Sequence, residues 1–323
     1  MTILEQYRQH FLPTYSNYPQ GRYATLLLLR QVESEAIFRT EGSGEPLNRE
    51  FVHAGLKDDG EPIQRVVISK RKQTAVERRT GRELLRKHHL LFQKDAKSGV
   101  CALNRNNPCG KCMDCMIYGY AVGGGGAQKS RVITDDAFSL HPATTIVGTK
   151  QFNALFDNST MRDADGTVST SIGTDEYVKP ESVFLDMETL KDVTEAEFLY
   201  ILGNILRSTR YGAISSRIGK VRNHLVGVIF SDCELFSNLE WTQATYDILR
   251  EDAAEPDFPL HLNHIRSASE EAISDLLPLI VGQTHIMLEE DATQLLADLQ
   301  GLYQDEEKLA QLLAKTSEMY PAG

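Results

Sequence analysis

Four of the five cysteines fall within fifteen positions, and this cluster constrains the fold more than any other feature of the sequence. Thiolates two residues apart can bind one tetrahedral metal ion, and Pro108 and Gly110 suit the tight turn that such a site requires. Four thiolates leave no open coordination position, which is typical of a structural site. We therefore predict a structural Zn²⁺ site with the spacing C-x7-C-x2-C-x2-C, formed by Cys101, Cys109, Cys112 and Cys115.

Two points about this site stay open. A C-x2-C-x2-C run also begins the bacterial ferredoxin motif, so an iron–sulfur cluster is the main rival, although the fourth cysteine followed by proline is missing. If Cys101 lies too far from the other three cysteines, His141 or His88 would serve as the fourth ligand. Cys233 follows a predicted strand and is interpreted as an ordinary thiol.

The charge of the chain is divided unevenly. The total of 34 basic and 45 acidic residues gives a net charge of -11, which argues against a nucleic-acid partner. However, residues 225–323 hold 19 acidic and 4 basic residues, whereas residues 1–224 hold 30 basic and 26 acidic ones. Residues 61–100 contain eleven Lys and Arg against four acids, and residues 207–224 contain five and no acid. This asymmetry predicts a basic surface that binds nucleic acid.

The two basic segments supply the candidate phosphate-binding residues. The first includes a helix predicted to begin at Thr74 with a capping box to Glu77, on which basic residues recur every four positions. In the second, glycines permit close backbone approach, guanidinium groups suit phosphates, and Tyr211 could stack on a base. The predicted RNA-binding set is Lys70, Arg71, Lys72, Arg78, Arg79, Arg82, Arg86, Lys129, Arg131, Arg210, Tyr211, Gly212, Arg217, Gly219, Lys220 and Arg222.

Candidate catalytic groups are weak. The glycine-rich segment before Lys129 resembles a phosphate-binding loop, but Gln128 replaces the required second glycine, and the residues that follow favour an extended conformation. No nucleophile elbow or protease-type zinc motif occurs. Asp58 and Asp59 are the only candidates for a cleavage reaction, and neither has a partner at a recognisable spacing. We predict a non-catalytic protein.

Hydrophobic periodicity predicts an α+β fold, in which the order of strands and helices fits a ferredoxin-like or RNA-recognition-type (RRM-type) βαββαβ core. The predicted strands are 23–31, 36–40, 66–72, 167–172, 182–187 and 225–230. Two predicted helices begin at Thr74 and at Thr194. A third spans 239–250, a fourth follows a Ser267–Glu270 capping box, and a fifth runs from His285 towards Met319. The predicted organisation is a first half of the core (15–97) with an inserted loop (41–61), a zinc-binding and glycine-rich insertion (98–130), an extended hairpin (131–180), a second half of the core (181–235) and a helical C-terminal region (236–323).

Three segments together resemble the backbone subunit of the type I-D CRISPR effector complex (Cascade), a crRNA-binding protein of the RAMP superfamily. They are Phe51-Val-His-Ala-Gly55, Asn107 to Gly119 with its cysteines, and Arg210 to Val221. The resemblance implies an RRM-like core with a zinc-binding insertion. It also implies that several copies polymerise along a CRISPR RNA (crRNA) and, with the other subunits, present the guide to target DNA.

The resemblance further implies a thumb around residues 161–177, with Met161 and Arg162, which folds over the guide of a neighbouring copy and displaces one nucleotide. In related RNA-targeting effectors a loop Asp of the backbone subunit cuts the target, which would make Asp58 or Asp59 catalytic here. Two other readings stay open: a stand-alone zinc-containing regulator that binds nucleic acid without a guide, and a redox protein that uses the cysteines. Because no apolar run reaches the ~20 residues of a membrane helix, and the N-terminus lacks a signal-peptide core, we expect a cytoplasmic protein without a membrane partner.

Overall fold

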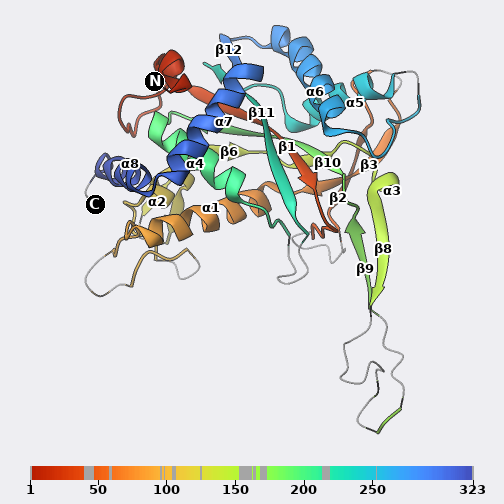
Figure 1. Cartoon of the computed structure of the whole chain (residues 1–323), viewed down its shortest axis with the longest axis horizontal. Helices are drawn as coiled ribbons and strands as arrows, with labels where there is room; N and C mark the ends of the chain where they lie inside the picture. The colour runs from red at the N-terminus through yellow and green to blue at the C-terminus, as the bar shows by residue number, and fades with distance from the viewer. Residues whose placement is uncertain are drawn as a thin grey trace.

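The structure, a computed structural model, describes residues 2–39, 47–57, 60–94, 97, 99–103, 107–123, 126–152, 162, 165–167, 173–212, 219–251 and 253–321. An eight-stranded sheet with the order β12-β11-β1-β10-β7-β3-β2 forms its centre, and β6 also pairs with β10 (Figure 1). All of these pairings are antiparallel. The strands are β1 (Tyr23–Val32), β2 (Arg49–His53), β3 (Pro62–Ile68), β6 (Val132–Thr134), β7 (Ala137–Ser139), β10 (Val183–Lys191), β11 (Val221–Ser231) and β12 (Thr284–Met287).

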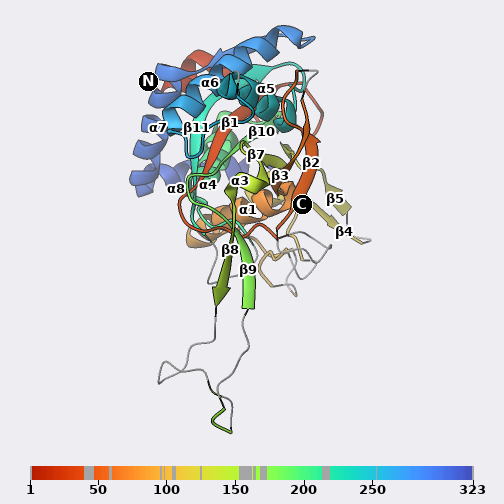
Figure 2. The same cartoon turned by 90° about the vertical axis from the view of Figure 1, so that its right-hand side faces the viewer.

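Helices cover both faces of this sheet (Figures 1 and 2). One face packs against a cluster that includes residues of α1, α2, α4, α7 and α8, and the other face packs against α5 and α6. The helices are η1 (Ile3–His10), α1 (Lys70–Lys87), α2 (Met113–Tyr118), α3 (Ala143–Ile146), α4 (Glu195–Arg207), α5 (Asn238–Arg250), α6 (Leu262–Leu276), η2 (Leu277–Leu279), α7 (Glu289–Gln304) and α8 (Glu306–Glu318).

The run of four leucines in β1 is explained by this two-sided burial. Side chains alternate between the faces of a strand. Leu26 and Leu28 accordingly pack in the cluster with α1 and α4, whereas Leu27 and Leu29 pack in the cluster with α5 and α6. All four are fully buried. A strand buried on both faces is expected to be apolar throughout rather than alternating.

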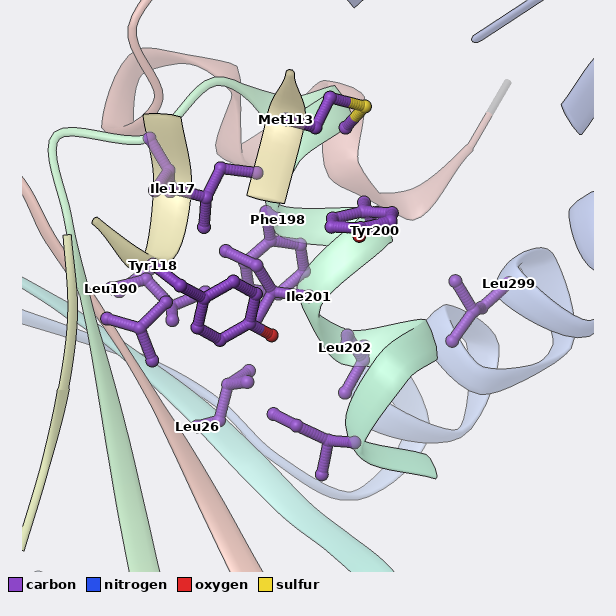
Figure 3. Close-up of a cluster of buried hydrophobic side chains, with 14 of the residues drawn as sticks. Leu26, Met113, Ile117, Tyr118, Leu190, Phe198, Tyr200, Ile201, Leu202 and Leu299 are labelled. Atoms are coloured by element: carbon purple, nitrogen blue, oxygen red, sulfur yellow. The ribbon is translucent and has the colours of Figure 1, made fainter. Parts of the chain in front are cut away.

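The cysteine-containing segment is part of the core. The sequence led us to interpret residues 98–130 as an insertion rather than a core element. Instead, Met113, Ile117 and Tyr118 of α2 point into the cluster formed with α4 and β1, and all three are at most 4% exposed (Figure 3). The segment continues into a small hairpin of β4 (Tyr120–Val122) and β5 (Gly126–Gln128).

A two-stranded arm leaves the body of the protein on the side on which α1 lies (Figures 1 and 2). It is built from β8 (Val147–Phe152) and β9 (Gly173–Val178), which pair antiparallel in unbroken register from Val147 opposite Val178 to Phe152 opposite Gly173. The predicted strand 167–172 lies mostly outside the described residues. The arm joins the body through a backbone exchange between Ala36 and Val178.

Several predicted helix boundaries are wrong for identifiable reasons. Helix α1 begins at Lys70, and the Thr74 hydroxyl donates to the Lys70 carbonyl inside the helix instead of capping it. Helix α6 begins at Leu262, so the Ser267–Glu270 pair lies within it. The predicted helix from His285 to Met319 is instead β12 followed by α7 and α8.

Other local predictions have mixed outcomes. The capping box of Thr194 and Glu197 is present at the start of α4. A second box, which we did not predict, joins Ser237 and Glu240 at the start of α5. The predicted strand 36–40 is not a strand over its described residues 36–39, where Ala36 forms only an isolated bridge to Val178.

A charged cluster lies in the centre of the core. The Arg30 guanidinium donates to Asp186 at 2.7 Å, to Glu188 at 2.6 Å and to Glu77 at 3.2 Å, and all four side chains are fully buried. It also donates to the Tyr211 hydroxyl at 2.8 Å. One cation faces three carboxyl groups, so full ionisation would leave excess negative charge in the core. Burial consequently raises the pKa of Asp186 to about 6 and the pKa of Glu188 well above its usual range.

This cluster predicts a stability that falls as the pH rises. The pKa values of Asp186 and Glu188 are higher in the folded state than in the unfolded state, so the folded protein binds protons on these groups that the unfolded chain releases. The stabilisation that these protons give is lost as the pH rises through the folded pKa values. Each pKa unit corresponds to about 1.4 kcal/mol. We expect Glu188→Gln to flatten this slope and to raise the free energy of unfolding at pH 8 by about 1 kcal/mol or more.

Denaturant unfolding at pH 5 to 8 measures this effect. Arg30→Gln is the second variant to compare. It leaves three buried carboxyl groups without a cation, so we expect it to lower the free energy of unfolding by about 3 to 5 kcal/mol. A Glu188→Gln protein with the pH slope of the parent chain would contradict the assignment.

Candidate metal centre and nucleic-acid interface

The four clustered cysteines converge on one point. Their sulfur atoms all lie within 4.8 Å of one another, and the four side chains are buried. The Sγ of Cys101 lies 3.9 Å from that of Cys112 and 3.6 Å from that of Cys115. A tetrahedron with metal–sulfur bonds of about 2.3 Å has edges of about 3.8 Å, so four thiolates in this arrangement can hold a metal ion.

The local sequence builds this geometry. Cys112 caps the N-terminus of α2, and Cys115 lies in the first turn of that helix. The Cys112 amide donates to the Cys109 sulfur, and the Cys109 amide to the Cys101 sulfur, both at 3.3 Å. Gly110 between them has φ +72°, where an added Cβ would lie 2.8 Å from the Tyr120 hydroxyl. A side chain at this position would be strained and crowded, so the turn requires glycine.

Cys101 completes the set, and the histidine alternatives fail. His141 lies elsewhere, where its Nε2 is 2.9 Å from the Asp257 carbonyl and its ring contacts Phe258. Within the described part of the chain, the four cysteines are the only group of His, Cys, Asp or Glu side chains that could hold a metal ion, so His88 is excluded as well.

A buried acid that sequence reasoning missed connects this centre to α1. Both carboxylate oxygens of Asp114, which is fully buried, accept from Arg78 at 3.0 Å, and one also accepts from Arg82 at 2.7 Å. Arg82 reaches the Cys101 sulfur at 3.6 Å and also donates to the Cys101 carbonyl. The sequence could have indicated this acid, because Asp114 lies between Cys112 and Cys115, two of the predicted metal ligands.

A groove lies between α1 and the cysteine-containing segment. Its volume is about 930 Å³, and five arginines of α1 line it: Arg71, Arg78, Arg79, Arg82 and Arg86. Arg71, Arg79 and Arg86 are exposed and, at spacings of eight and seven residues, share one helix face. The opposite wall includes Ala102, Leu103 and Tyr118. The α1 side of the groove is therefore mainly basic, although exposed Glu83 also lines it, and the other side is largely apolar.

The second basic segment lies at the junction of α4 and β11. Arg210 and Lys220 pair through an isolated antiparallel β-bridge of their backbones. The side chains of Lys220 and Arg222 both form ion pairs with the Glu33 carboxylate, with N–O distances of 3.0 and 2.6 Å. The hydrogen bond from Lys220 lowers the pKa of Glu33. A Cβ added at Gly219 would lie 2.2 Å from the Glu35 carbonyl, so this residue must be glycine to permit close packing.

Four of the predicted RNA-binding residues have side chains that are buried or are bound by other parts of the fold. The Tyr211 ring is fully buried against Arg30, 5.0 Å from its guanidinium carbon, and cannot stack on a base. Arg131 is 8% exposed and forms an ion pair with Glu197 in the core. Arg78 and Arg82 line the groove, but their guanidinium groups are bound to Asp114. These four residues position other parts of the fold.

The remaining predicted residues fall into two groups. Those on the surface or partly exposed are Lys70, Arg71, Lys72, Arg79, Arg86, Lys129, Arg162, Arg210, Gly212, Lys220 and Arg222, while Gly219 is buried. Those outside the described residues are Asp58, Asp59, Met161 and Arg217, so the predictions about cleavage and most of those about the thumb are not tested. Arg162 donates to the Gly166 carbonyl at 2.6 Å.

Among the described helices, none is both long enough and apolar enough to cross a lipid bilayer.

The sequence pattern of a family described as Csc2 Crispr matches residues 10–313. No curated protein matches the chain. The crystal structure of Thermofilum pendens Csc2 is similar, with 19% sequence identity and a TM-score of 0.63 over 100% of this chain and 99% of that one. A chain from a CRISPR RNA-guided surveillance complex in a pre-nicking state is similar with 9% identity and a TM-score of 0.53, over 91% of this chain and 100% of that one. These two likenesses are of fold, whereas the family match spans almost the whole sequence. The chain therefore belongs to the Csc2 CRISPR family.

Proposed function

We propose that this protein is the backbone subunit of a type I-D CRISPR effector complex. Several copies bind side by side along one crRNA, and with the other subunits they present its guide to target DNA. Base pairing between guide and target then supplies sequence specificity, while the protein holds the RNA backbone by shape and charge. We further propose that the subunit is a scaffold without catalytic activity.

The groove along α1 is the observation that carries this proposal. Phosphate contacts supply most of the affinity of a protein that binds nucleic acid without reading its sequence. Arg71, Arg79 and Arg86 line this groove, and exposed Lys129 directly precedes Ser130, which also lines it. Lys220 and Arg222 extend the positive surface at the end of β11. Membership of a CRISPR family supports RNA as the ligand of this surface.

We propose that the core is of the RRM type. The order β11-β1-β10 followed by β6 and β7, all antiparallel, agrees with the 4-1-3-2 order of a βαββαβ unit, with α1 and α4 as its two helices. Strands β2, β3 and β12 would then be additions at the two edges. The β8–β9 arm supports a thumb that reaches a neighbouring copy.

We propose Zn²⁺ as the metal at the four cysteines. A d¹⁰ ion with no redox chemistry suits a closed, buried, tetrahedral thiolate site. When bound, the metal would supply a structural cross-link between the segment before α2 and α2 itself. The Arg82–Asp114 pair would then transmit this rigidity to the wall of the groove.

The nucleic acid that copurifies with the protein tests the proposed function. The chain is expressed with a CRISPR array and its partner subunits, and the bound nucleic acid is extracted, sized and sequenced. We expect RNA of discrete guide length with repeat-derived ends. Heterogeneous fragments, or no RNA, from a stable metal-loaded protein would favour the stand-alone regulator instead.

A further inference from the structure

Cys101 connects the two parts of the candidate site, because it belongs to the cysteine cluster and also lines the groove along α1. Among the described residues, it is the one cysteine that lines this groove. Cys112 and Cys115 are fully buried, whereas Cys101 is 3% exposed and Cys109 is 8% exposed. Leu103, two positions further along the groove wall, is 39% exposed. A small molecule that enters the groove therefore meets Cys101 before the other three cysteines.

The surroundings of the Cys101 sulfur favour its reaction with an oxidant. Arg82 donates to this sulfur at 3.6 Å, and the Cys109 amide donates to it at 3.3 Å. Donors of this kind stabilise a thiolate, which is the form of cysteine that attacks an electrophile. The Arg82 guanidinium is also placed to donate to the hydroxide that leaves when a thiolate attacks a peroxide.

A second thiol lies within reach of Cys101. The Sγ of Cys101 is 3.6 Å from that of Cys115 and 3.9 Å from that of Cys112. The sulfur atoms of a disulfide are about 2.05 Å apart, so a shift of about 1.6 Å joins Cys101 to Cys115. Cys101 lies outside the helices and strands, so this shift affects a loop rather than the helix α2.

We propose that Cys101 is a modification site, at which hydrogen peroxide reaches the cysteine cluster from the groove. The Cys101 thiolate attacks one peroxide oxygen, the O–O bond breaks and hydroxide leaves, so the sulfur becomes a sulfenic acid. The Cys115 thiolate then attacks this sulfur, a disulfide forms and a second hydroxide leaves. The two thiolates give up two electrons, the peroxide accepts them, and two protons from solvent convert both hydroxides to water.

The modification is expected to release the metal and to alter the groove wall. A tetrahedral ion held by four thiolates loses half of its ligands when two of them form a disulfide. The shift of Cys101 also removes a partner of Arg82, which shares Asp114 with Arg78 on the groove wall. The consequences for metal and for RNA rest on the proposed function and on zinc as the proposed metal, whereas the modification of Cys101 does not.

Peroxide treatment of the Cys233→Ser chain tests the modification without RNA. This background removes the fifth cysteine, so every thiol that is lost belongs to the cluster. The zinc-loaded chain is treated with about one equivalent of hydrogen peroxide. Released zinc is measured with a chromogenic chelator, and the remaining thiols are counted. We expect one zinc ion and two thiols to be lost per chain, and a reductant with added zinc to restore both. A chain that keeps its zinc and all four thiols would overturn the proposal.

Tryptic peptides identify the cysteines in the disulfide. Trypsin separates the cluster into three peptides, which are 98–105 with Cys101, 106–111 with Cys109, and 112–129 with Cys112 and Cys115. After the free thiols are blocked, we expect a disulfide between peptides 98–105 and 112–129. A disulfide that does not contain peptide 98–105 would overturn the assignment to Cys101, even when zinc is released.

Guide RNA tests the path through the groove. At an RNA concentration of about ten times Kd, roughly one tenth of the chains are unbound, so zinc release should be about tenfold slower if RNA covers Cys101. The same RNA should protect the Arg79→Glu/Arg86→Glu variant far less, because this variant is expected to bind RNA weakly. Release at an unchanged rate from RNA-saturated protein would overturn the path through the groove.

The affinity of the oxidised chain for RNA tests the coupling between the cysteine cluster and the groove. We expect oxidation to lower the affinity for an oligonucleotide that holds one copy by about tenfold, and reductant with zinc to restore it. Equal affinities before and after oxidation would overturn this coupling. If the untreated chain does not bind RNA, the proposed function fails, while the thiol count and the tryptic peptides still test Cys101.

Discussion

Replacing Cys112 by Ser is expected to remove the metal and to lower the Tm of the protein by about 10 °C or more. Cys112 is fully buried, and with Cys115 it holds α2, which contributes Met113, Ile117 and Tyr118 to the core. Structural zinc contributes about 10 to 16 kcal/mol of apparent binding free energy in small zinc-binding peptides, and about 2 to 4 °C of Tm corresponds to each kcal/mol in larger domains. Metal content per chain and thermal unfolding, with and without a chelator, measure the two effects.

Cys233→Ser is the matched control for this experiment. Cys233 is half-buried beside Gly282, outside the cysteine cluster, so this change should alter neither the metal content nor the Tm appreciably. The absorption spectrum decides between the two candidate metals. A colourless protein with one zinc per chain supports the proposal, whereas visible absorption with bound iron would replace zinc by an iron–sulfur cluster.

The double variant Arg79→Glu/Arg86→Glu is expected to lower the affinity for guide RNA by about 30-fold or more at 0.1 M salt. Both side chains are exposed on the wall of the α1 groove, and each reversal replaces attraction to a phosphate by repulsion. For single strands, the slope of log K against log salt changes by about 0.7 for each phosphate that the protein no longer neutralises. With two such phosphates, the slope should decrease by about 1.4 in a filter-binding or fluorescence titration.

Lys315→Glu is the control for this measurement, because it changes an exposed basic residue of α8 that does not line the α1 groove. Its affinity for an oligonucleotide that holds one copy should equal that of the parent chain. Should the Arg79→Glu/Arg86→Glu variant retain both the affinity and the salt slope, the α1 groove would not be the RNA-binding surface. Unfolding curves of both variants should match the parent curve, since neither arginine is buried.

The cysteine cluster, which could hold a metal ion, was predictable because its chemistry is local in sequence. Three of the cysteines lie within seven residues, and their spacing alone restricts the geometry. The choice of Cys101 over His88 or His141 required the fold, because the conformation of the chain between Cys101 and Cys109 cannot be read from the sequence. The capping box at Thr194 was predictable for the same reason as the cysteine spacing: both partners lie within one turn.

The surface that we propose for nucleic-acid binding was only partly predictable. The sequence placed Arg78, Arg82 and Arg86 on one stripe of α1, but Asp114 binds the first two and leaves Arg86 exposed. Likewise, nothing near Arg131 or Tyr211 in sequence shows that Glu197 and Arg30 meet them in the core. A count of charges gives the sign of a surface, whereas the direction of each side chain depends on contacts distant in sequence.

The position of β1 has a consequence for how this chain is synthesised. Residues 23–32 pair with 183–191 on one side and with 221–231 on the other. The ribosome must therefore make more than half of the protein before either hydrogen-bonding edge of the first strand is satisfied. Until then, Leu26 to Leu29 remain an unpaired apolar segment on the nascent chain, and long-range pairing of this kind is slow. Nascent chains that stall before residue 231 should accordingly be bound by chaperones.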